Sequence, residues 1–256
     1  MKSLSYLLLQ IKDEQKSFWR NVPAWVFTFL FTILFLVLFS ALAGNSKIQT
    51  LNGIKFEDYY VPSIITLGII SSCYTSLAMT LISRRESGNL KALRATPISP
   101  IIYLGGLIGS ALIVSLILVI ITVSFGISVY GTSFPHHLVA LFISLAVGTF
   151  AFCSFGIAVS SIIPNQEAAP AVINGIILPL YFISGTFYAL GNSTLLARIA
   201  MFFPVRPFIL SVFTSFDPLN NSNGYDMHAL LSLLAWGVIS ALFSTYRFRF
   251  LPKQAH

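Results

Sequence analysis

Charged residues are scarce in this sequence. Asp, Glu, Lys and Arg make up 9% of its 256 residues, whereas soluble domains average about 25%. Hydrophobic residues make up 56%, so a soluble protein of this composition could not cover its surface with polar side chains. We therefore predict an integral membrane protein. The net charge of +7 comes from short basic clusters beside apolar runs, which is typical of membrane anchoring, so no nucleic-acid partner is expected.

The chemical groups that an enzyme would need are equally sparse. The sequence has no Gly-x-x-x-x-Gly-Lys-Ser/Thr phosphate loop, no His-Glu-x-x-His motif, and no carboxylate pair or Ser-His set in its apolar runs. Glu167 stands alone, and the adjacent His136 and His137 have no third metal ligand near them. The two cysteines, Cys73 and Cys153, lie inside apolar runs and are interpreted as core residues, not as a disulfide. We expect no catalytic, metal or cofactor site, and any energy for transport must come from another chain.

Six apolar runs follow one another, each close to or above the ~20 residues that a helix needs to cross a bilayer. They cover residues 23–43, 59–83, 101–130, 138–163, 170–188 and 227–246. Backbone polar groups must be paired internally in lipid, which leaves helix as the expected conformation. No charged residue occurs from Ala95 to Gln166, and the turn chemistry of Gly131–His137 divides this stretch into two spans. The predicted fold is all-α, a polytopic membrane protein with six transmembrane helices in a domain covering residues 23–246.

Small and hydroxyl-bearing residues are scattered through these runs. Gly105 and Gly109 form a small-xxx-small pair, which usually indicates close helix packing in membranes. The alternative is a weakly polar face toward a substrate path or a partner subunit. The hydroxyl-bearing residues include Thr28, Thr32, Ser71, Ser72, Thr75, Ser76, Ser124, Ser144 and Ser154.

The segment 1–22 has the pattern of an amphipathic helix. Its apolar residues fall on one face at helical spacing, and three cations accompany them. Such a helix would lie in the membrane interface with its cations toward anionic lipid headgroups. A frayed tail is the alternative. The apolar residues are Leu4, Leu7, Leu8, Ile11 and Phe18, and the cations are Lys12, Lys16 and Arg20.

The distribution of basic residues predicts the orientation. A cytoplasmic N-terminus places eleven of the 15 Lys and Arg residues on the inner side. Positive residues concentrate in cytoplasmic loops, so we expect both termini, including the tail 247–256, to lie in the cytoplasm. The expected location is the cell membrane (the inner or plasma membrane), with membrane lipid as a partner.

The outer segment 189–226 is the least regular part of the sequence. It holds two arginines, two aspartates and three prolines. Two apolar stretches in it, 195–203 and 208–213, are too short or too interrupted to span a bilayer. We expect short helices that lie on the outer leaflet or dip into it.

The loop 84–100 between the second and third runs carries the most distinctive pattern. Residues 86–95 favour a helix, with Leu90 and Leu93 on one face, and Pro97 ends it. A short charged helix with two apolar side chains is typical of a docking element. A simple basic stop-transfer cluster would explain Arg84 and Arg85 but not the leucine spacing.

Several stretches resemble one known family. Arg85-Glu86-x-Gly88, followed by the stretch 93–99 (Leu-Arg-Ala-Thr-Pro-Ile-Ser), resembles the signature of permease subunits of type-2 ABC transporters, especially the drug-export branch related to daunorubicin-resistance permeases. The stretches 56–62 and 179–187, with Phe203-Pro204, resemble the family's second span, fifth span and outer region. The sequence departs from the pattern at Ser63, where glycine is expected.

This resemblance implies an N-terminal interface helix, six spans, a cytoplasmic coupling helix and short re-entrant outer helices. It implies two ABC ATPase subunits, which bind ATP and Mg on separate chains, and a second permease subunit, identical or homologous. The coupling residues would be Arg84, Arg85, Glu86, Gly88, Leu90, Leu93, Arg94, Thr96 and Pro97. The outer gate and re-entrant residues would be Pro179, Ser184, Gly185, Phe187 and Pro204.

The function expected from the sequence is the permease subunit of an ATP-driven exporter of amphipathic drugs or lipid-like molecules, with no ATPase site of its own. The apolar, weakly hydrogen-bonding spans favour such substrates. Export of a glycan or a lipid-linked glycan is the alternative within this class. A membrane-embedded lipid-modifying enzyme and a non-transporting anchor or sensor are the alternatives from other classes.

Overall fold

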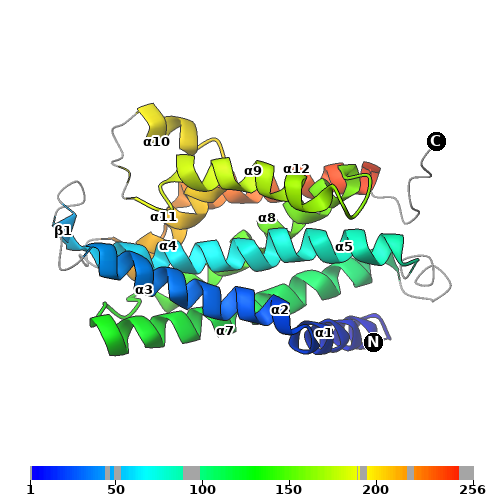
Figure 1. Cartoon of the computed structure of the whole chain (residues 1–256), viewed down its shortest axis with the longest axis horizontal. Coiled ribbons are helices and arrows are strands. Elements are labelled where there is room, and N and C mark those ends of the chain that lie inside the picture. Colours follow the sequence, from blue (N-terminus) through cyan, green and yellow to red (C-terminus); the bar gives the residue numbers. More distant parts are fainter. Residues whose placement is uncertain are drawn as a thin grey trace.

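The computed structural model describes residues 2–43, 47–48, 53–88, 99–188, 190, 195–217 and 222–247, which form an elongated helical bundle (Figure 1). Its helices are α1 (Lys2–Arg20), α2 (Val22–Trp25), α3 (Phe31–Ala43), α4 (Phe56–Ile70), α5 (Leu77–Glu86), α7 (Pro100–Tyr130), α8 (Leu138–Ile162), α9 (Ala169–Ser184), α10 (Leu195–Ala200), α11 (Val205–Phe216) and α12 (Met227–Arg247). The π-helical segments η1 (Val26–Leu30) and η3 (Ser71–Ser76) join α2 to α3 and α4 to α5. The short strands β1 (Lys47–Ile48) and β2 (Ile54–Lys55) pair antiparallel.

Five helical stretches of the described chain are long and apolar enough to cross a membrane. They are Val22–Leu42, Phe56–Glu86, Ile102–Tyr130, Leu138–Ile162 and Met227–Tyr246. They match five of the six predicted spans, which makes the chain a multi-pass membrane protein.

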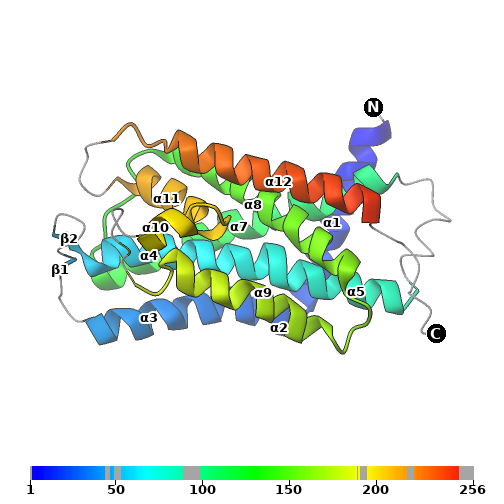
Figure 2. The same cartoon turned by 90° about the horizontal axis from the view of Figure 1, so that it is seen from above.

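The remaining predicted span, 170–188, is shorter than expected. Its helix α9 has 16 residues and ends at Ser184 because Gly185 adopts a left-handed conformation with φ of 80°. A helix of this length rises ~24 Å, less than the ~30 Å hydrocarbon core. α9 nevertheless runs along the bundle like its neighbours (Figure 2), and the count of six spans stays a prediction.

The two ends of the bundle differ. α1, the end of α5 and the end of α12 lie together at one end, here called the α1 end (Figures 1 and 2). The strands, α10 and α11 lie at the opposite end, here called the α11 end. The start of α1 and the end of α12 therefore lie at the same end of the bundle, which is expected for a chain that crosses the membrane an even number of times.

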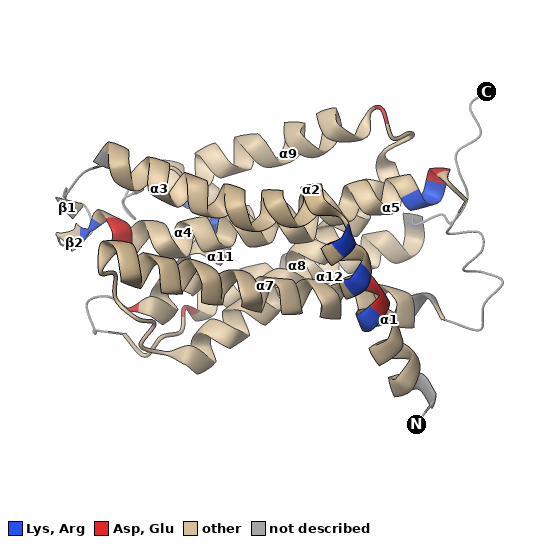
Figure 3. Cartoon of the chain, turned by 60° about the horizontal axis from the view of Figure 1, so that its bottom comes forward, with Lys and Arg blue, Asp and Glu red and all other residues tan. Residues whose placement is uncertain are grey.

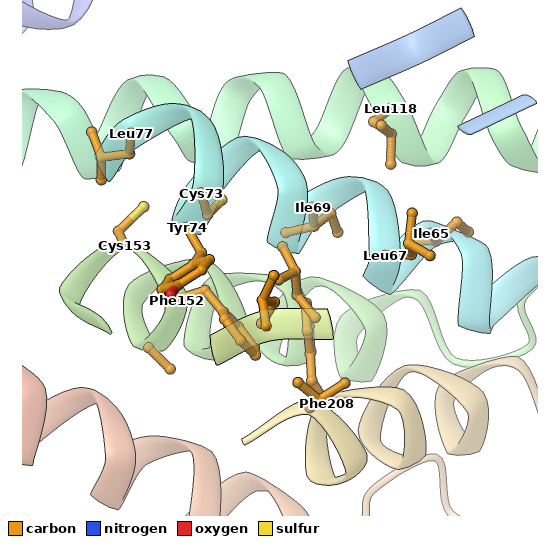
Figure 4. Close-up of a cluster of buried hydrophobic side chains, with 14 of the residues drawn as sticks. Ile65, Leu67, Ile69, Cys73, Tyr74, Leu77, Leu118, Phe152, Cys153 and Phe208 are labelled. Carbon is orange, nitrogen blue, oxygen red and sulfur yellow. The ribbon is translucent and has the colours of Figure 1, made fainter. Parts of the chain in front are cut away.

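The second predicted span is the centre of the core. Every residue from Tyr59 to Ile70 is buried, which is expected of a helix that is apolar on all sides. Its side chains meet those of α7, α8 and α11 (Figure 4). Cys73 and Cys153 are free and buried within this core, so the interpretation of both as core residues is confirmed.

Two glycines of α8 allow this close packing. A Cβ atom at Gly148 would lie 2.2 Å from Cε2 of Phe208, so α11 packs directly on the α8 backbone. A Cβ atom at Gly156 would lie 3.0 Å from the carbonyl oxygen of Tyr74 in η3. Small residues thus let neighbouring backbones approach.

α1 lies across α7 at the α1 end. A Cβ atom at Gly105 would lie 3.2 Å from the side chain of Leu7, and one at Gly109 would lie 2.8 Å from the side chain of Ile11. The small-xxx-small pair is therefore where α1 packs against α7. Leu4 and Leu8 are 63% and 59% exposed. The single apolar face predicted for α1 is therefore divided, because part of it packs on the bundle and part remains free. Its position in the membrane interface stays a prediction.

The described residues of the outer segment form two unlike helices. α10 leaves Leu195 74% exposed, whereas most of α11 is buried between α4, α8 and α12. Helix α11 begins before the predicted apolar stretch 208–213 and ends after it. It can begin earlier because Pro204 is its N-cap and because a proline such as Pro207 is tolerated in the first turn of a helix.

The described charged residues concentrate at the two ends of the bundle and on α1. The long helices between the two ends are almost uncharged (Figure 3).

Candidate coupling site and outer gate

Arg84 joins three helices at the α1 end. Its Nη1 and Nη2 atoms donate to Oε1 and Oε2 of Glu14 at 2.7 and 2.8 Å, and Nη1 also donates to the Tyr103 hydroxyl at 2.9 Å. Two parallel bonds between a guanidinium and a carboxylate are among the strong, geometrically specific contacts of proteins. Gln10 donates a further bond to Glu14 at 2.9 Å. Arg84 therefore connects α5 to α1 and to α7.

Arg85 binds the end of α8. Its Nη1 donates to the Ser160 carbonyl at 3.0 Å, and its Nη2 donates to the carbonyls of Ile163 and Pro164 at 2.6 and 3.3 Å. The last carbonyls of a helix have no N–H partner within it and carry the negative end of its dipole. The side chain is only 6% exposed, so Arg85 is a buried cap of α8.

Glu86 holds the turn between α8 and α9. Its Oε1 accepts the backbone N–H of Gln166 at 2.6 Å, and its side chain is exposed. Gly88, whose φ is 76°, then lets the chain leave α5 in a conformation that other residues rarely adopt. Three consecutive residues thus contact α1, α7, the end of α8 and the turn before α9.

The rest of the predicted coupling helix lies outside the described residues. This applies to Leu90, Leu93, Arg94, Thr96 and Pro97, whose docking role stays a prediction. The described chain resumes at Ser99, whose hydroxyl accepts the N–H of Ile102 at 3.3 Å. Ser99 is therefore the N-cap of α7 and Pro100 its first residue, which gives the Ser-Pro end of the loop motif a structural explanation.

A cavity of about 400 Å³ lies beside these contacts, between α1, η3, α5 and α7. Glu14 and Arg84 stand among its lining residues, together with a row of hydroxyl-bearing side chains. This cavity was not predicted from the sequence, because its walls come from helices that are distant in the chain.

Three of the five residues predicted for the outer gate, Ser184, Gly185 and Phe187, lie at the end of α9. Arg206 of α11 donates to the Ser184 carbonyl at 3.2 Å and to the Leu190 carbonyl at 3.0 Å. The Tyr59 hydroxyl donates to the Gly185 carbonyl at 2.9 Å, and the Tyr60 hydroxyl donates to the Phe187 carbonyl. Ser184, Gly185 and Phe187 therefore belong to one segment that α4 and α11 hold by its backbone.

Sequence reasoning missed the residues that hold this segment. Arg206 is only 2% exposed, although the sequence placed it simply among the outer cations. A single arginine in a short apolar stretch was the available signal, since ionisable residues at membrane depth usually have a specific partner. Of the two predicted prolines, Pro204 is the N-cap of α11, whereas Pro179 lies within α9 with its side chain exposed.

The histidine pair contacts the end of α11. Nδ1 of His136 lies 2.9 Å from the Asp217 carbonyl oxygen, and Nε2 of His137 lies 3.5 Å from Oδ2 of Asp217. Within the described ranges there is no group of three or more His, Cys, Asp or Glu residues that could hold a metal ion. The pair is thus in contact with α11 in this structure.

Comparisons with known proteins agree with this architecture. The sequence profile of the family described as ABC-2 type transporter matches residues 7–216. The inner membrane transport permease YadH of Escherichia coli (strain K12) is 22% identical over 184 residues, which cover 68% of this chain and 71% of that protein. Proteins of the same name from Escherichia coli O157:H7 and Shigella flexneri give the same values.

Proposed function

This chain belongs to the ABC-2 type transporter family and is a membrane transport permease, and from this premise we propose that it is the membrane-spanning subunit of an ATP-driven exporter. The ATP and Mg would be bound by two ABC ATPase subunits on separate chains. The loop between α5 and α7 would dock on an ATPase and carry its movement into the membrane.

The contacts of Arg84, Arg85 and Glu86 are the observation that carries this proposal. A loop that only fixed topology would need positive charge and nothing more, because acidic residues contribute little to orientation. Here each residue binds a different element, and Glu86 contributes a hydrogen bond to Gln166. A displacement of the loop would therefore reach α1, α7, α8 and α9 together.

The charge pattern supports placing the α1 end in the cytoplasm. The cations of α1 and the adjacent pair Arg84 and Arg85 all belong to this end, where α12 also finishes (Figure 3). Basic residues favour the cytoplasmic side of a membrane. An ATPase at this end would have access to the loop between α5 and α7.

A second permease subunit, identical or homologous, would cover the outward face of α9. Asn174 is exposed there, next to Gly175, where an added Cβ would meet no atom within 4 Å. Leu178 and Phe182 continue this face and are 48% and 60% exposed. An amide in an apolar helix and an adjacent glycine are residues that membrane helices use to associate.

The substrates that fit this subunit are amphipathic drugs or lipid-like molecules. The long apolar helices offer hydroxyl groups and apolar surface, with charges concentrated at the ends of the bundle. Such a surface favours molecules that carry few charges. A glycan or lipid-linked glycan is the competing substrate class, since hydroxyl groups also suit sugars.

The test co-expresses the permease with an ABC ATPase, which is first to be sought in the neighbouring reading frames. We expect the two to co-purify, and we expect Leu90→Asp and Leu93→Asp to weaken their association. Glu86→Ala should preserve assembly but uncouple hydrolysis from export, whereas Glu86→Gln keeps an acceptor for the Gln166 N–H and should be milder. Normal assembly and normal transport-linked hydrolysis in all these variants would contradict the proposal.

A further inference from the structure

The cavity at the α1 end has the size of a small-molecule site. Its volume of about 400 Å³ lies within the ~300–1,000 Å³ range of ligand pockets. One wall is a row of hydroxyl-bearing residues at helical spacing, Ser72, Ser76, Thr80 and Ser83. Ser72 and Ser76 belong to the π-helical segment η3, and such segments within α-helices occur frequently at functional sites.

The hydroxyls of this row are available to a ligand. None of the four donates or accepts a hydrogen bond with another residue that the structure describes. Other hydroxyls of the long helices donate to a carbonyl of the preceding turn, as Thr28 does to Ala24 and Ser115 does to Ala111. The row therefore offers donors and acceptors that its own helix leaves unused.

The charges at the cavity are already paired. Glu14 and Arg84 line it, but they bind each other through two bonds of 2.7 and 2.8 Å. An anionic headgroup would have to displace Glu14 from Arg84, and a cationic one would have to displace Arg84 from Glu14. The cavity thus presents neutral hydrogen-bonding groups and no unpaired charge from these two residues, which favours an uncharged ligand.

The remaining walls are mixed. Phe18 of α1, Leu77 of α5, and Leu107 and Val114 of α7 give them an apolar part, and the other polar side chains there are uncharged: Ser17, Asn21, Ser110 and Gln166. Leu107 and Val114 lie two turns apart on α7, so they extend the apolar wall along the direction of the spans. A ligand that bonds to the hydroxyls and leaves an alkyl chain along α7 would satisfy both surfaces.

We propose that this cavity binds the uncharged, hydroxyl- or carbonyl-bearing headgroup of an amphipathic molecule that enters from the membrane leaflet at the α1 end. The inference rests on the proposed transport function, because it takes this bound amphipath to be the transported molecule. α1 and α5 both line the cavity and are joined by the Glu14–Arg84 pair, so a movement of the coupling loop would change its shape.

The test compares three photoreactive dodecyl probes on the complete complex in nanodiscs. Their headgroups are glucoside, phosphate and trimethylammonium. We expect the glucoside to label residues of the cavity wall, and the two charged probes to label them much less. The double variant Ser76→Ala/Thr80→Val should lower this labelling about ten-fold, because two neutral hydrogen bonds are lost. The control is Thr214→Val in α11, which is similarly half-buried but distant, and it should leave labelling unchanged.

Competition identifies the source of the headgroup. Unlabelled dodecyl glucoside should displace the probe, and free glucose should not. Any one of four results would overturn the inference. These are equal labelling by the charged probes, labelling only outside the cavity, unchanged labelling in the double variant, and displacement of the probe by free glucose. The glucoside should also stimulate ATP hydrolysis in the wild type and not in the double variant. If the ATPase does not bind the permease but the glucoside probe still labels the cavity, the proposed transport function is refuted and the ligand site is still supported.

Discussion

The Glu14–Arg84 pair should hold α1 against the bundle. We predict that Glu14→Gln and Arg84→Gln each loosen α1, because each leaves one partly buried charge without its counter-ion. Removing one partner of a fully buried pair costs about 3–5 kcal/mol. The Arg84 and Glu14 side chains are 20% and 10% exposed, so water replaces part of the lost interaction. We therefore expect a cost of about 2 kcal/mol for each substitution.

Hydrogen exchange of the α1 amides measures this cost directly, since it reports the local opening of an element. A loss of about 2 kcal/mol corresponds to exchange about 30-fold faster when α1 opens as a unit. The control is Lys12→Gln, which removes an exposed cation from the same helix. It should change exchange far less.

A double-mutant cycle separates the pair from its surroundings. The variant carrying both Glu14→Gln and Arg84→Gln should cost about as much as either substitution alone, because an amide pair replaces the ion pair without an orphaned charge. The reasoning fails if the two costs simply add, or if both single variants exchange at the wild-type rate. Additive costs would mean that the two residues stabilise α1 independently of each other, and wild-type exchange in both single variants would mean that the glycine contacts of α7 hold α1 by themselves.

Three further substitutions test other contacts. Gly148→Leu should lower the free energy of unfolding by about 1–3 kcal/mol or more, because its side chain would overlap the ring of Phe208. A thermal melt of the isolated, monomeric subunit measures this beside Gly175→Leu, where an added Cβ would meet no atom of this chain within 4 Å. Arg206→Met leaves the Ser184 and Leu190 carbonyls without their donor and should raise the labelling rate of a cysteine placed at Phe187, whereas unchanged labelling would remove Arg206 from the gate. Arg85→Gln should loosen the end of α8, seen as faster amide exchange confined to its last turn, and exchange at the wild-type rate would contradict the capping role.

The spans were predictable because their signal is local and repetitive. A run of about 20 apolar residues needs no knowledge of its neighbours to indicate a membrane helix. The end of α9 was misplaced for the same reason, since the apolar stretch 170–188 continues past Gly185 although the helix does not. A left-handed glycine ends a helix without interrupting the hydropathy pattern.

The candidate site was only half predictable. The sequence marked Arg84, Arg85 and Glu86 as unusual, because two cations and an anion follow an apolar run. Most of their partners, among them Glu14 and the carbonyls at the end of α8, lie about 70 or more residues away along the chain, whereas Tyr103 lies 19 residues from Arg84. The cavity was not predictable, because no single helix defines it.

The sequence by itself determined that this protein lies in a lipid bilayer and that it is helical. It also determined where most of the spans lie and which loop resembles a coupling element. These properties depend on hydropathy and local motifs, which each segment carries alone. The tertiary structure decided which face of α1 packs on α7, which carbonyls Arg85 and Arg206 bind, and where a cavity remains. Those outcomes depend on contacts of a few ångströms between side chains from distant segments. The spacing of residues within one segment does not predict which other segment packs against it.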